Sequence, residues 1–505
     1  MDIQSESPMR RSTLRRAETA PDATPRDKGL HSTRTRPYDP IPDHEADRIL
    51  QDAFTLLAEI GCRFDPGTEA DTILAAAGCE VMGNGVIRIP EAVTRAALAS
   101  TAKQVTLWNR DASHGIQIDP DHTWFMPGMT CIKVHDLTTG EHRFSTRDDL
   151  ATITRLADGM DHIDAVCVSV KDVPNSNRWG EVGEFLTMMQ NTTKPLEYLC
   201  EWTTSLQAAI DMGAALRGSP EALREKPYFL HIITPLPLMY AEAHVEQIIL
   251  CARSGIPTQI GTIAIGGAST PITTAGTLVH CLATDFAAMV LAQAAAPGAF
   301  AIGSTNPYFM EVATGGIGNL PQTILGEQII CQIRRRLGLP SFTALGGAAN
   351  ARRFSQDSVF ETATLMTQIF HNRPATCDYL GSIDQGITYS PQALLLCNDI
   401  AGMLRAMWQG TVVDDETLAL NLTREIGLFG TVLGHPHTAR HCRNAPWNSP
   451  YFGANEPLAT TDKPDEDLLQ RIDRDLNRRL AAPGPAPLPD ALLTQLHALH
   501  AQHVE

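Results

Sequence analysis

The chain has 505 residues, 43% of them hydrophobic, which is enough to bury one large core with extensions. Its 57 acidic and 40 basic side chains give a formal net charge of −17, and this acidity argues against binding to nucleic acid or an anionic membrane. The longest weakly polar stretch, 286–303, is interrupted by Gln293, Pro297 and Gly298, which is typical of a buried helix and strand and not of a membrane span.

The first segment, residues 1–37, is rich in Arg, Ser, Thr and Pro and has no apolar periodicity, so we expect a disordered tail. A transit peptide is the alternative, which the acidic residues in this segment disfavour. No apolar signal segment follows Met1, and the eleven cysteines occur without a CxxC pair, as is common for reduced thiols. We therefore expect a cytoplasmic protein.

Residues 38–146 are predicted to form a small α+β unit. Two helices with apolar residues at helical spacing, 43–60 and 68–77, each stop at a glycine, Gly61 and Gly78. A strand, a helix and two β hairpins are predicted to follow, at 86–90, 90–99, 104–118 and 123–144.

Residues 147–455 repeat a pattern of strand and helix, which predicts a parallel sheet. The predicted strands are 165–170, 196–200, 228–233, 258–263, 299–302, 341–344 and 376–380. An eighth strand near 431–433 would close a (β/α)8 TIM barrel, and a doubly wound open sheet is the alternative. No GxGxxG or GxxxxGK[ST] motif opens a helix, so nothing here supports dinucleotide or P-loop binding. Residues 456–505 are expected to be a helical tail.

Many short segments, in one order from about residue 43 to 452, resemble the MttB-like trimethylamine methyltransferase family. Among them are LAEIGC at 57–62, LWNRD at 107–111, DLTTGEHR at 136–143, NTTKP at 191–195 and PITTAGT at 271–277. The resemblance implies a TIM barrel that transfers a methyl group from a methylated amine to the cobalt of a partner corrinoid protein, with no permanently bound cofactor.

The resemblance also narrows the substrate. Family members that act on trimethylamine carry pyrrolysine near the segment that matches 345–354, where this chain has Gly-Gly-Ala-Ala-Asn at 346–350. Pyrrolysine-free relatives are associated with quaternary amines such as glycine betaine. The resemblance therefore implies a betaine-like substrate.

The chemistry of a quaternary amine is consistent with this reading. Its nitrogen is already cationic and leaves as a neutral tertiary amine, so positioning beside cobalt(I) suffices without a general acid or a covalent residue. Aromatic faces attract such a cation by about 0.5–2 kcal/mol each, helped by a carboxylate. The carboxylate of a betaine needs a cationic or amide partner.

Active sites of TIM barrels lie at the carboxyl ends of the strands, and the candidate residues are taken from there. The expected aromatic cage is Trp202, Tyr308, Phe309 and Tyr379. Glu201 and Glu311 are expected to balance the charge and position the substrate, and the substrate carboxylate is assigned to His231, Asn350 and Arg352. The alternatives are helix packing for Trp202 and a solvated surface role for Arg352.

Four further residues are expected to face the corrin: Gly316, Gly347, His435 and His437. Ordinary tight turns are the alternative for the glycines. The run His435-Pro-His437-Thr-Ala-Arg-His441 could also ligate zinc. Because no cysteine or carboxylate is suitably spaced beside it, we expect no metal and interpret the run as a loop over the barrel mouth.

The resemblance thus implies a corrinoid-dependent methyltransferase of methanogenesis-type one-carbon metabolism, acting on a quaternary amine, with glycine betaine as the first candidate. One alternative is an enzyme of the same fold that uses tetrahydrofolate or another acceptor. A second is a non-catalytic betaine-binding homologue. A homo-oligomer is expected, with a corrinoid protein as partner.

Overall fold

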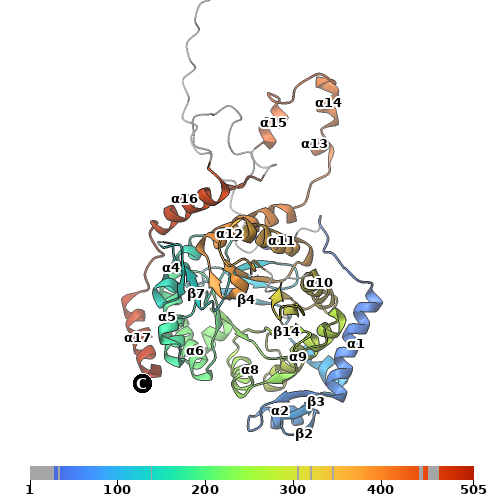
Figure 1. Ribbon diagram of the computed structural model, residues 1–505, viewed down its shortest axis with the longest axis vertical. Helices are drawn as coiled ribbons and strands as arrows, with labels where there is room; N and C mark the ends of the chain where they lie inside the picture. The colour runs from blue at the N-terminus through green and yellow to red at the C-terminus, as the bar shows by residue number, and fades with distance from the viewer. Residues whose placement is uncertain are drawn as a thin grey trace, which may run out of the picture.

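The computed structural model describes residues 28–31, 34–137, 139–303, 306–318, 321–343, 346–442, 447–452 and 466–504. The tail expected at 1–37 lies mostly outside this range, so its disorder stays a prediction. Within the described residues the protein is an α/β fold, in which helices surround a set of parallel strands (Figure 1). Two helices lie in the predicted C-terminal tail, α16 (Leu468–Leu480) and α17 (Asp490–Val504).

The N-terminal unit contains the predicted helices and a small sheet. Its elements are α1 (Asp43–Glu59), β1 (Cys62–Phe64), α2 (Ala70–Ala76), β2 (Glu80–Gly83), β3 (Val86–Arg88) and α3 (Glu91–Ser100). The helix α1 buries Ala46, Ile49, Ala53 and Leu57, a spacing that places them on one face. The predicted hairpin at 104–118 is confirmed, because β4 (Val105–Trp108) pairs antiparallel with β5 (Gly115–Ile118).

The parallel strands form two arcs. The first has the order β15-β13-β11-β10-β9 and the second β18-β19-β6. The bounds are β6 (Trp124–Pro127), β9 (Val166–Cys167), β10 (Leu196–Leu199), β11 (Phe229–Ile233), β13 (Thr258–Ile260), β15 (Ala301–Gly303), β18 (Phe342–Thr343) and β19 (Thr376–Leu380). All seven strands predicted between 147 and 380 are therefore present.

The eighth parallel strand is β6, and the prediction of a strand at 431–433 is wrong. Trp124, Phe125 and Met126 are all buried, as expected of a strand covered on both faces, and β6 pairs in parallel with β19. Val432 and Leu433 are apolar but exposed, and they belong to no strand. The predicted hairpin at 123–144 is also corrected, since only β7 (Lys133–His135) and β8 (His142–Phe144) form one.

The two arcs meet on one side. The Asp164 N–H donates to the Phe125 carbonyl at 2.8 Å, and the Thr130 N–H donates to the Val168 carbonyl, so β6 lies beside β9. On the other side no strand pair joins β15 to β18 within 301–303 and 342–343. The sheets of the described residues are therefore not closed, and the expected ring is not observed as such.

Helices cover the outside of these strands. They are α4 (Arg147–Asp158), α5 (Arg178–Asn191), α6 (Thr203–Arg217), α8 (Glu242–Ser254), α9 (Thr274–Ala295), α10 (Pro321–Arg336), α11 (Gln356–Asn372) and α12 (Pro391–Trp408). The helix α9 is long and apolar enough to cross a membrane, but 78% of its most apolar window is buried inside the fold. It packs on α1, where Phe54 stacks on Phe286. We conclude that α9 is a core helix.

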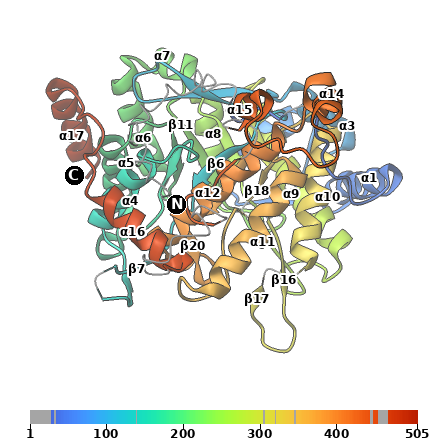
Figure 2. The same ribbon diagram turned by 90° about the horizontal axis from the view of Figure 1, so that it is seen from above.

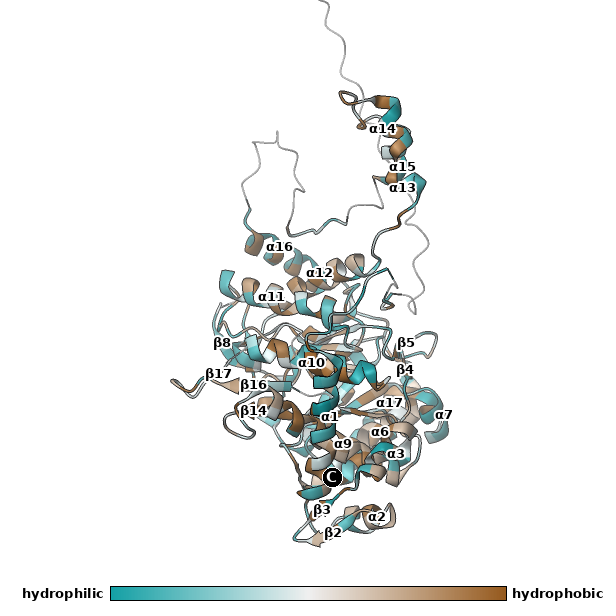
Figure 3. Ribbon diagram, turned by 90° about the vertical axis from the view of Figure 1, so that its right-hand side faces the viewer, coloured by the Kyte–Doolittle hydropathy of each residue, from teal (hydrophilic) through white to brown (hydrophobic). Residues whose placement is uncertain are grey.

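One segment projects from the body. Residues 409–442, called the arm below, contain α13 (Asp415–Leu418), α14 (Leu420–Ile426) and α15 (Pro436–His441). Figures 1 and 3 show these helices standing away from the rest of the molecule. In Figure 2, α14 and α15 lie near the edge opposite β16 (Asn306–Met310) and β17 (Ile317–Gly318). None of residues 409–442 is buried.

Candidate functional site

A small cavity lies past the carboxyl ends of the parallel strands. There β13 and β15 continue as β14 (Ile263–Gly266) and β16, which pair in parallel, and β17 returns along β16. The cavity has a volume of about 190 Å³ and is lined by Ile263, Tyr308, Ile317, Gly318, Ala348, Asn350, Tyr379 and Gln385. A larger groove of about 550 Å³ includes Pro227 and Pro257 and lies at the opposite, amino ends of the strands. Because ligands of parallel α/β sheets bind at the carboxyl ends, the smaller cavity is the candidate site.

Two tyrosines dominate this cavity. Tyr308 comes from β16 and Tyr379 from β19, and both side chains are partly exposed. Burial raises the pKa of Tyr379, and the neighbouring Tyr308 raises it further, so both phenols stay protonated at neutral pH. Their neutral aromatic faces suit a cation better than an anion.

A buried carboxyl pair lies near the cavity. Asp378 lines an adjoining narrow pocket together with Thr234 and Asn306, and this pocket shares Ile263 and Tyr379 with the cavity. The Gln259 side-chain N–H donates to Oδ2 of Asp378 at 3.0 Å, whereas Oδ1 has no hydrogen-bond partner among the described residues. Burial raises the pKa of Asp378 to about 7. Near neutral pH this carboxyl therefore exists partly as an anion.

The second carboxyl of the pair belongs to Glu197 in β10. Both of its oxygens are buried and lack a partner in the part of the chain that the structure describes. Burial and the negative charge of Asp378 raise the pKa of Glu197, so it holds its proton. Two like groups in one apolar setting cannot both ionise easily, and Asp378 is the one that does.

Three of the predicted substrate-binding residues meet at the cavity: Tyr308, Asn350 and Tyr379. Gly347 directly precedes the lining residue Ala348, but it is buried, and a Cβ there would lie 3.0 Å from Sγ of Cys397. The structure therefore brings two of the predicted tyrosines and one predicted amide together at this cavity.

Other predicted residues do not line the cavity. Trp202 is 51% exposed and precedes α6, and the Glu201 backbone N–H donates to the Glu181 carboxylate at 2.8 Å. Phe309 points the opposite way along β16 from Tyr308 and packs beside Gly266. The proposed cage thus has two aromatic members in place of four.

His231 faces outward from β11 toward α8. Its Nδ1 lies 3.1 Å from the Tyr198 carbonyl, and its Nε2 lies 3.1 Å from Oε1 of Gln247. Burial lowers the pKa of His231 to about 4, so it is neutral at physiological pH. A neutral imidazole that faces α8 and not the cavity cannot hold a substrate carboxylate, and we interpret His231 as a core residue.

The loop residues lie outside the cavity. Glu311 and Gly316 are exposed at the turn between β16 and β17, where the Glu311 N–H donates to the Gly316 carbonyl at 2.8 Å. The Arg352 side chain is 88% exposed, 3.8 Å from Asp384. His435 and His437 belong to the arm, on the side of the molecule away from β17 (Figure 2). The structure therefore does not bring these histidines to the cavity.

Sequence reasoning missed Gln385, Gln259 and Glu197. Glu197 had a detectable signal, because it is the one charged residue in an otherwise apolar strand, Leu196–Leu199, and a buried charge needs a reason. Gln385 had none. It follows β20 (Ser382–Ile383), and only the fold places it beside Tyr379.

Comparison with known proteins identifies the family. The sequence profile of trimethylamine methyltransferase (MTTB) matches residues 9–504, nearly the whole chain. The chain belongs to the trimethylamine methyltransferase family. Membership in this family makes the chain a relative of transferases that move methyl groups, consistent with the segments that first suggested the resemblance.

Three named relatives are similar to this chain over most of its length. The chain is 29% identical to trimethylamine methyltransferase MttB of Desulfitobacterium hafniense, over 79% of this chain and 81% of the relative. It is 30% identical to MttB of Methanosarcina barkeri, over 74% and 78%. It is 23% identical to glycine betaine methyltransferase of Desulfitobacterium hafniense, over 92% and 97%.

A solved structure supports the fold. The monomethylamine methyltransferase MtmB of Methanosarcina barkeri aligns with a TM-score of 0.52, covering 88% of each chain at 11% sequence identity. At that identity the match concerns the arrangement of the backbone alone. It agrees with an α/β architecture.

Proposed function

We propose that this protein transfers a methyl group from a quaternary amine to the corrinoid of a partner protein. The observation that carries the proposal is the cavity lined by Tyr308 and Tyr379 at the strand ends, with Asp378 in an adjoining narrow pocket that shares Tyr379 with it. No Lys or Arg lines this cavity among the residues described. Aromatic faces with a carboxyl nearby favour an onium group that cannot donate a hydrogen bond.

Each lining residue has a role in this proposal. The tyrosine faces hold the onium group, and ionised Asp378 neutralises part of its charge. The Asn350 and Gln385 amides are the candidates for a substrate carboxylate, since His231 faces away and Arg352 is solvated. When the methyl group leaves, the electron pair of the broken N–CH3 bond stays on nitrogen, so the product is a neutral tertiary amine.

The corrinoid of the partner would supply reduced cobalt as the methyl acceptor. The cavity fits an acceptor that arrives from outside, because Tyr308 and Asn350 are partly exposed and Gln385 is exposed at its rim. A methyl group held between these side chains is accessible from solvent. Glycine betaine is the first candidate substrate, supported by the relative that spans 92% of this chain.

We further propose that the two arcs of strands belong to one (β/α)8 ring. Eight parallel strands are present, and seven of the eight junctions that a ring needs carry strand pairing or backbone hydrogen bonds. The junction between β15 and β18 would complete it. A cytoplasmic location and a homo-oligomeric state also remain predictions, the second of which light scattering tests.

The function is tested by supplying the purified chain with chemically reduced cobalamin and, in parallel, glycine betaine, tetramethylammonium or trimethylamine. We expect a demethylated product from a quaternary amine, dimethylglycine in the case of betaine, quantified by mass spectrometry. Turnover of trimethylamine alone would contradict the proposal. Tetramethylammonium has the onium group without the carboxylate, so its rate measures what the amides contribute.

Two other results would favour the alternatives. Product that forms with tetrahydrofolate and without cobalamin would identify a different acceptor. Betaine binding by calorimetry without turnover under any condition would identify a non-catalytic homologue.

A further inference from the structure

The arm has no buried core among its described residues that could stabilise its conformation. Its three helices, α13, α14 and α15, have four, seven and six residues, and no residue from 409 to 442 is buried. Isolated helices shorter than about 12–15 residues are marginal in water. Small units without a hydrophobic core are usually held by a disulfide or a metal ion. Polar contacts between α13 and α15 are therefore of particular interest.

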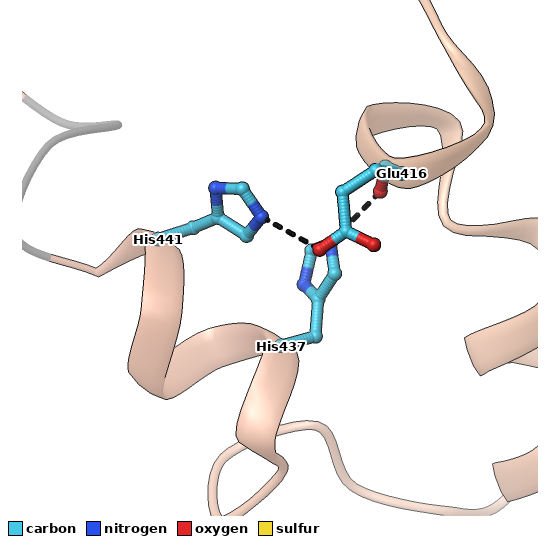
Figure 4. Close-up of side chains that lie close together, drawn as sticks. All are labelled: Glu416, His437 and His441. Carbon is cyan, nitrogen blue, oxygen red and sulfur yellow. Dashed lines mark hydrogen bonds and ion pairs between the residues drawn. The ribbon is translucent and has the colours of Figure 1, made fainter.

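Three metal-binding side chains meet at this contact (Figure 4). Glu416 comes from α13, while His437 and His441 are four residues apart on one face of α15. Their potential ligand atoms all lie within 4.8 Å of one another. Nε2 of His441 is 3.1 Å from Oε1 of Glu416, and the two imidazole centroids are 4.5 Å apart.

We propose that Glu416, His437 and His441 bind one Zn²⁺ ion that ties α13 to α15. Two imidazoles and a carboxylate are an established ligand set for zinc, and three protein ligands leave one tetrahedral position for water. The site lies in the arm, apart from the cavity, so its role is to fix the shape of the arm and not to take part in methyl transfer.

The surrounding charges are compatible with a cation. Arg440 donates to Oε1 of Glu416 at 2.8 Å, and a carboxylate has a second oxygen with which to hold the guanidinium when a metal binds. His437 contacts the Glu416 backbone carbonyl at 3.0 Å, and a small rotation of its ring frees Nε2 for a metal. His435 is not part of the group. Its Nδ1 accepts a hydrogen bond from the His437 N–H at the start of α15.

The sequence run of histidines pointed to this region but not to this ligand set. The carboxylate is 21 residues before His437, too far for a spacing motif, and the fold brings it there. The earlier expectation of no metal rested on the lack of a nearby carboxylate along the sequence. Glu416 removes that objection.

The experiment uses the full chain, stripped with a chelator and titrated with Zn²⁺ alone against a chromogenic competitor. We expect one equivalent to bind, and the double variant His437→Gln/His441→Gln to lose at least about tenfold in affinity, because even second-shell partners contribute that much. Glutamine keeps a polar side chain of similar reach, so the arm need not unfold. His114→Gln, at the exposed turn between β4 and β5, is the matched control and should bind zinc like the unaltered chain.

A second readout reports on the arm itself. Zinc should slow tryptic cleavage after Arg424 in the unaltered chain and in His114→Gln, but not in the double variant. Equal zinc affinity in the unaltered chain and the double variant would overturn the proposal. So would zinc binding that leaves cleavage at Arg424 unchanged.

Discussion

Tyr379 has a backbone conformation that bulky residues rarely adopt. Its φ is +69°, in the left-handed region, where a residue with a large side chain pays about 1–3 kcal/mol. The pairing of β19 with β6 shifts register between Cys377 and Leu380, so the strand is irregular at this point. Gly346 packs against it, where a Cβ would come within 1.9 Å of the Asp378 carbonyl. Because the strand is irregular here, the consecutive residues Asp378 and Tyr379 both line the narrow pocket beside the cavity, and Tyr379 also lines the cavity itself.

Alternation along a strand explains what the sequence could and could not predict at the residue scale. Tyr308 and Phe309 are adjacent on β16, and only the first lines the cavity. In β11, Ile232 lines the narrow pocket while His231 faces α8. Position at a strand end predicts which segments lie near the cavity, but a shift of one residue in register decides which side chain points inward.

The aromatic contribution of Tyr308 can be separated from that of its hydroxyl. Tyr308→Ala removes a ring face and should weaken the binding of a quaternary amine about threefold to thirtyfold, the range expected from one cation–π contact. Tyr308→Phe keeps the ring and should bind within about twofold of the unaltered chain. Calorimetry with tetramethylammonium measures both. If Phe and Ala behave alike, the ring face is not what holds the cation.

The charge of Asp378 should make binding depend on pH. A bound cation favours the carboxylate and lowers the pKa of Asp378 from about 7, so binding releases a proton near neutrality. Affinity for a quaternary amine should therefore rise as the pH rises through 7 and fall at pH 6 and below. Titration calorimetry in two buffers of different ionisation enthalpy measures the proton directly.

Asp378→Asn is the test of this assignment. It should weaken binding about tenfold or more at pH 8 and flatten the pH dependence, since one pKa unit corresponds to about 1.4 kcal/mol. Asp399→Asn is the matched control. That carboxyl is also buried with a pKa raised to about 6, but it contacts Ser449 and not the cavity. An unchanged pH profile in Asp378→Asn would place the titrating group elsewhere.

At the scale of elements, alternation of strand and helix predicted seven parallel strands because each is a short apolar run followed by an amphipathic helix. The pattern did not identify β6 as a parallel strand, because β7 and β8 lie between it and the next helix, α4. The strand predicted at 431–433 was wrong because its apolar residues were assumed to be buried. Leu433 is 84% exposed, and in the arm there is no second layer of structure to cover it.

The role of α9 as a core helix can be tested by mutation. Phe286 is buried on α9 and stacks on Phe54 of α1 with ring centroids 5.6 Å apart. Phe286→Ala should cost about 3–5 kcal/mol in the free energy of unfolding, seen as a lower denaturant midpoint. Phe144→Ala, at a ring that is 59% exposed, should change it by less than about 0.5 kcal/mol. Equal midpoints would mean that α9 does not depend on this packing.

At the scale of the whole molecule, the arm should open independently of the body. Without metal, tryptic cleavage after Arg424 should precede cleavage at arginines of the body such as Arg334, which is buried against Asp285. Mass spectrometry of a timed digest gives the order. Early cleavage within α9 or α10 would contradict the picture of a stable body with an exposed arm.

The strand β6 lies within the predicted N-terminal unit, 38–146, but it completes the parallel set of the predicted barrel domain, 147–455. A fragment that starts at residue 147 lacks β6, so β9 and β19 become open edges. We expect this fragment to aggregate. A chain that lacks only residues 1–27 should elute as a single species of the same oligomeric state as the full chain. Size-exclusion chromatography distinguishes the two. A monodisperse fragment would show that 147–455 folds alone.

The same strand limits how early the chain can fold while it is being synthesised. The Thr123 hydroxyl, at the start of β6, donates to the Pro374 carbonyl across 251 residues of sequence, and the edge of β6 that pairs with β19 stays open until β19 has been made. Until the ribosome has delivered residues near 380, the nascent polypeptide keeps an unpaired strand edge in contact with solvent. A product of translation that stops before this point keeps that strand edge open, and we expect it to aggregate.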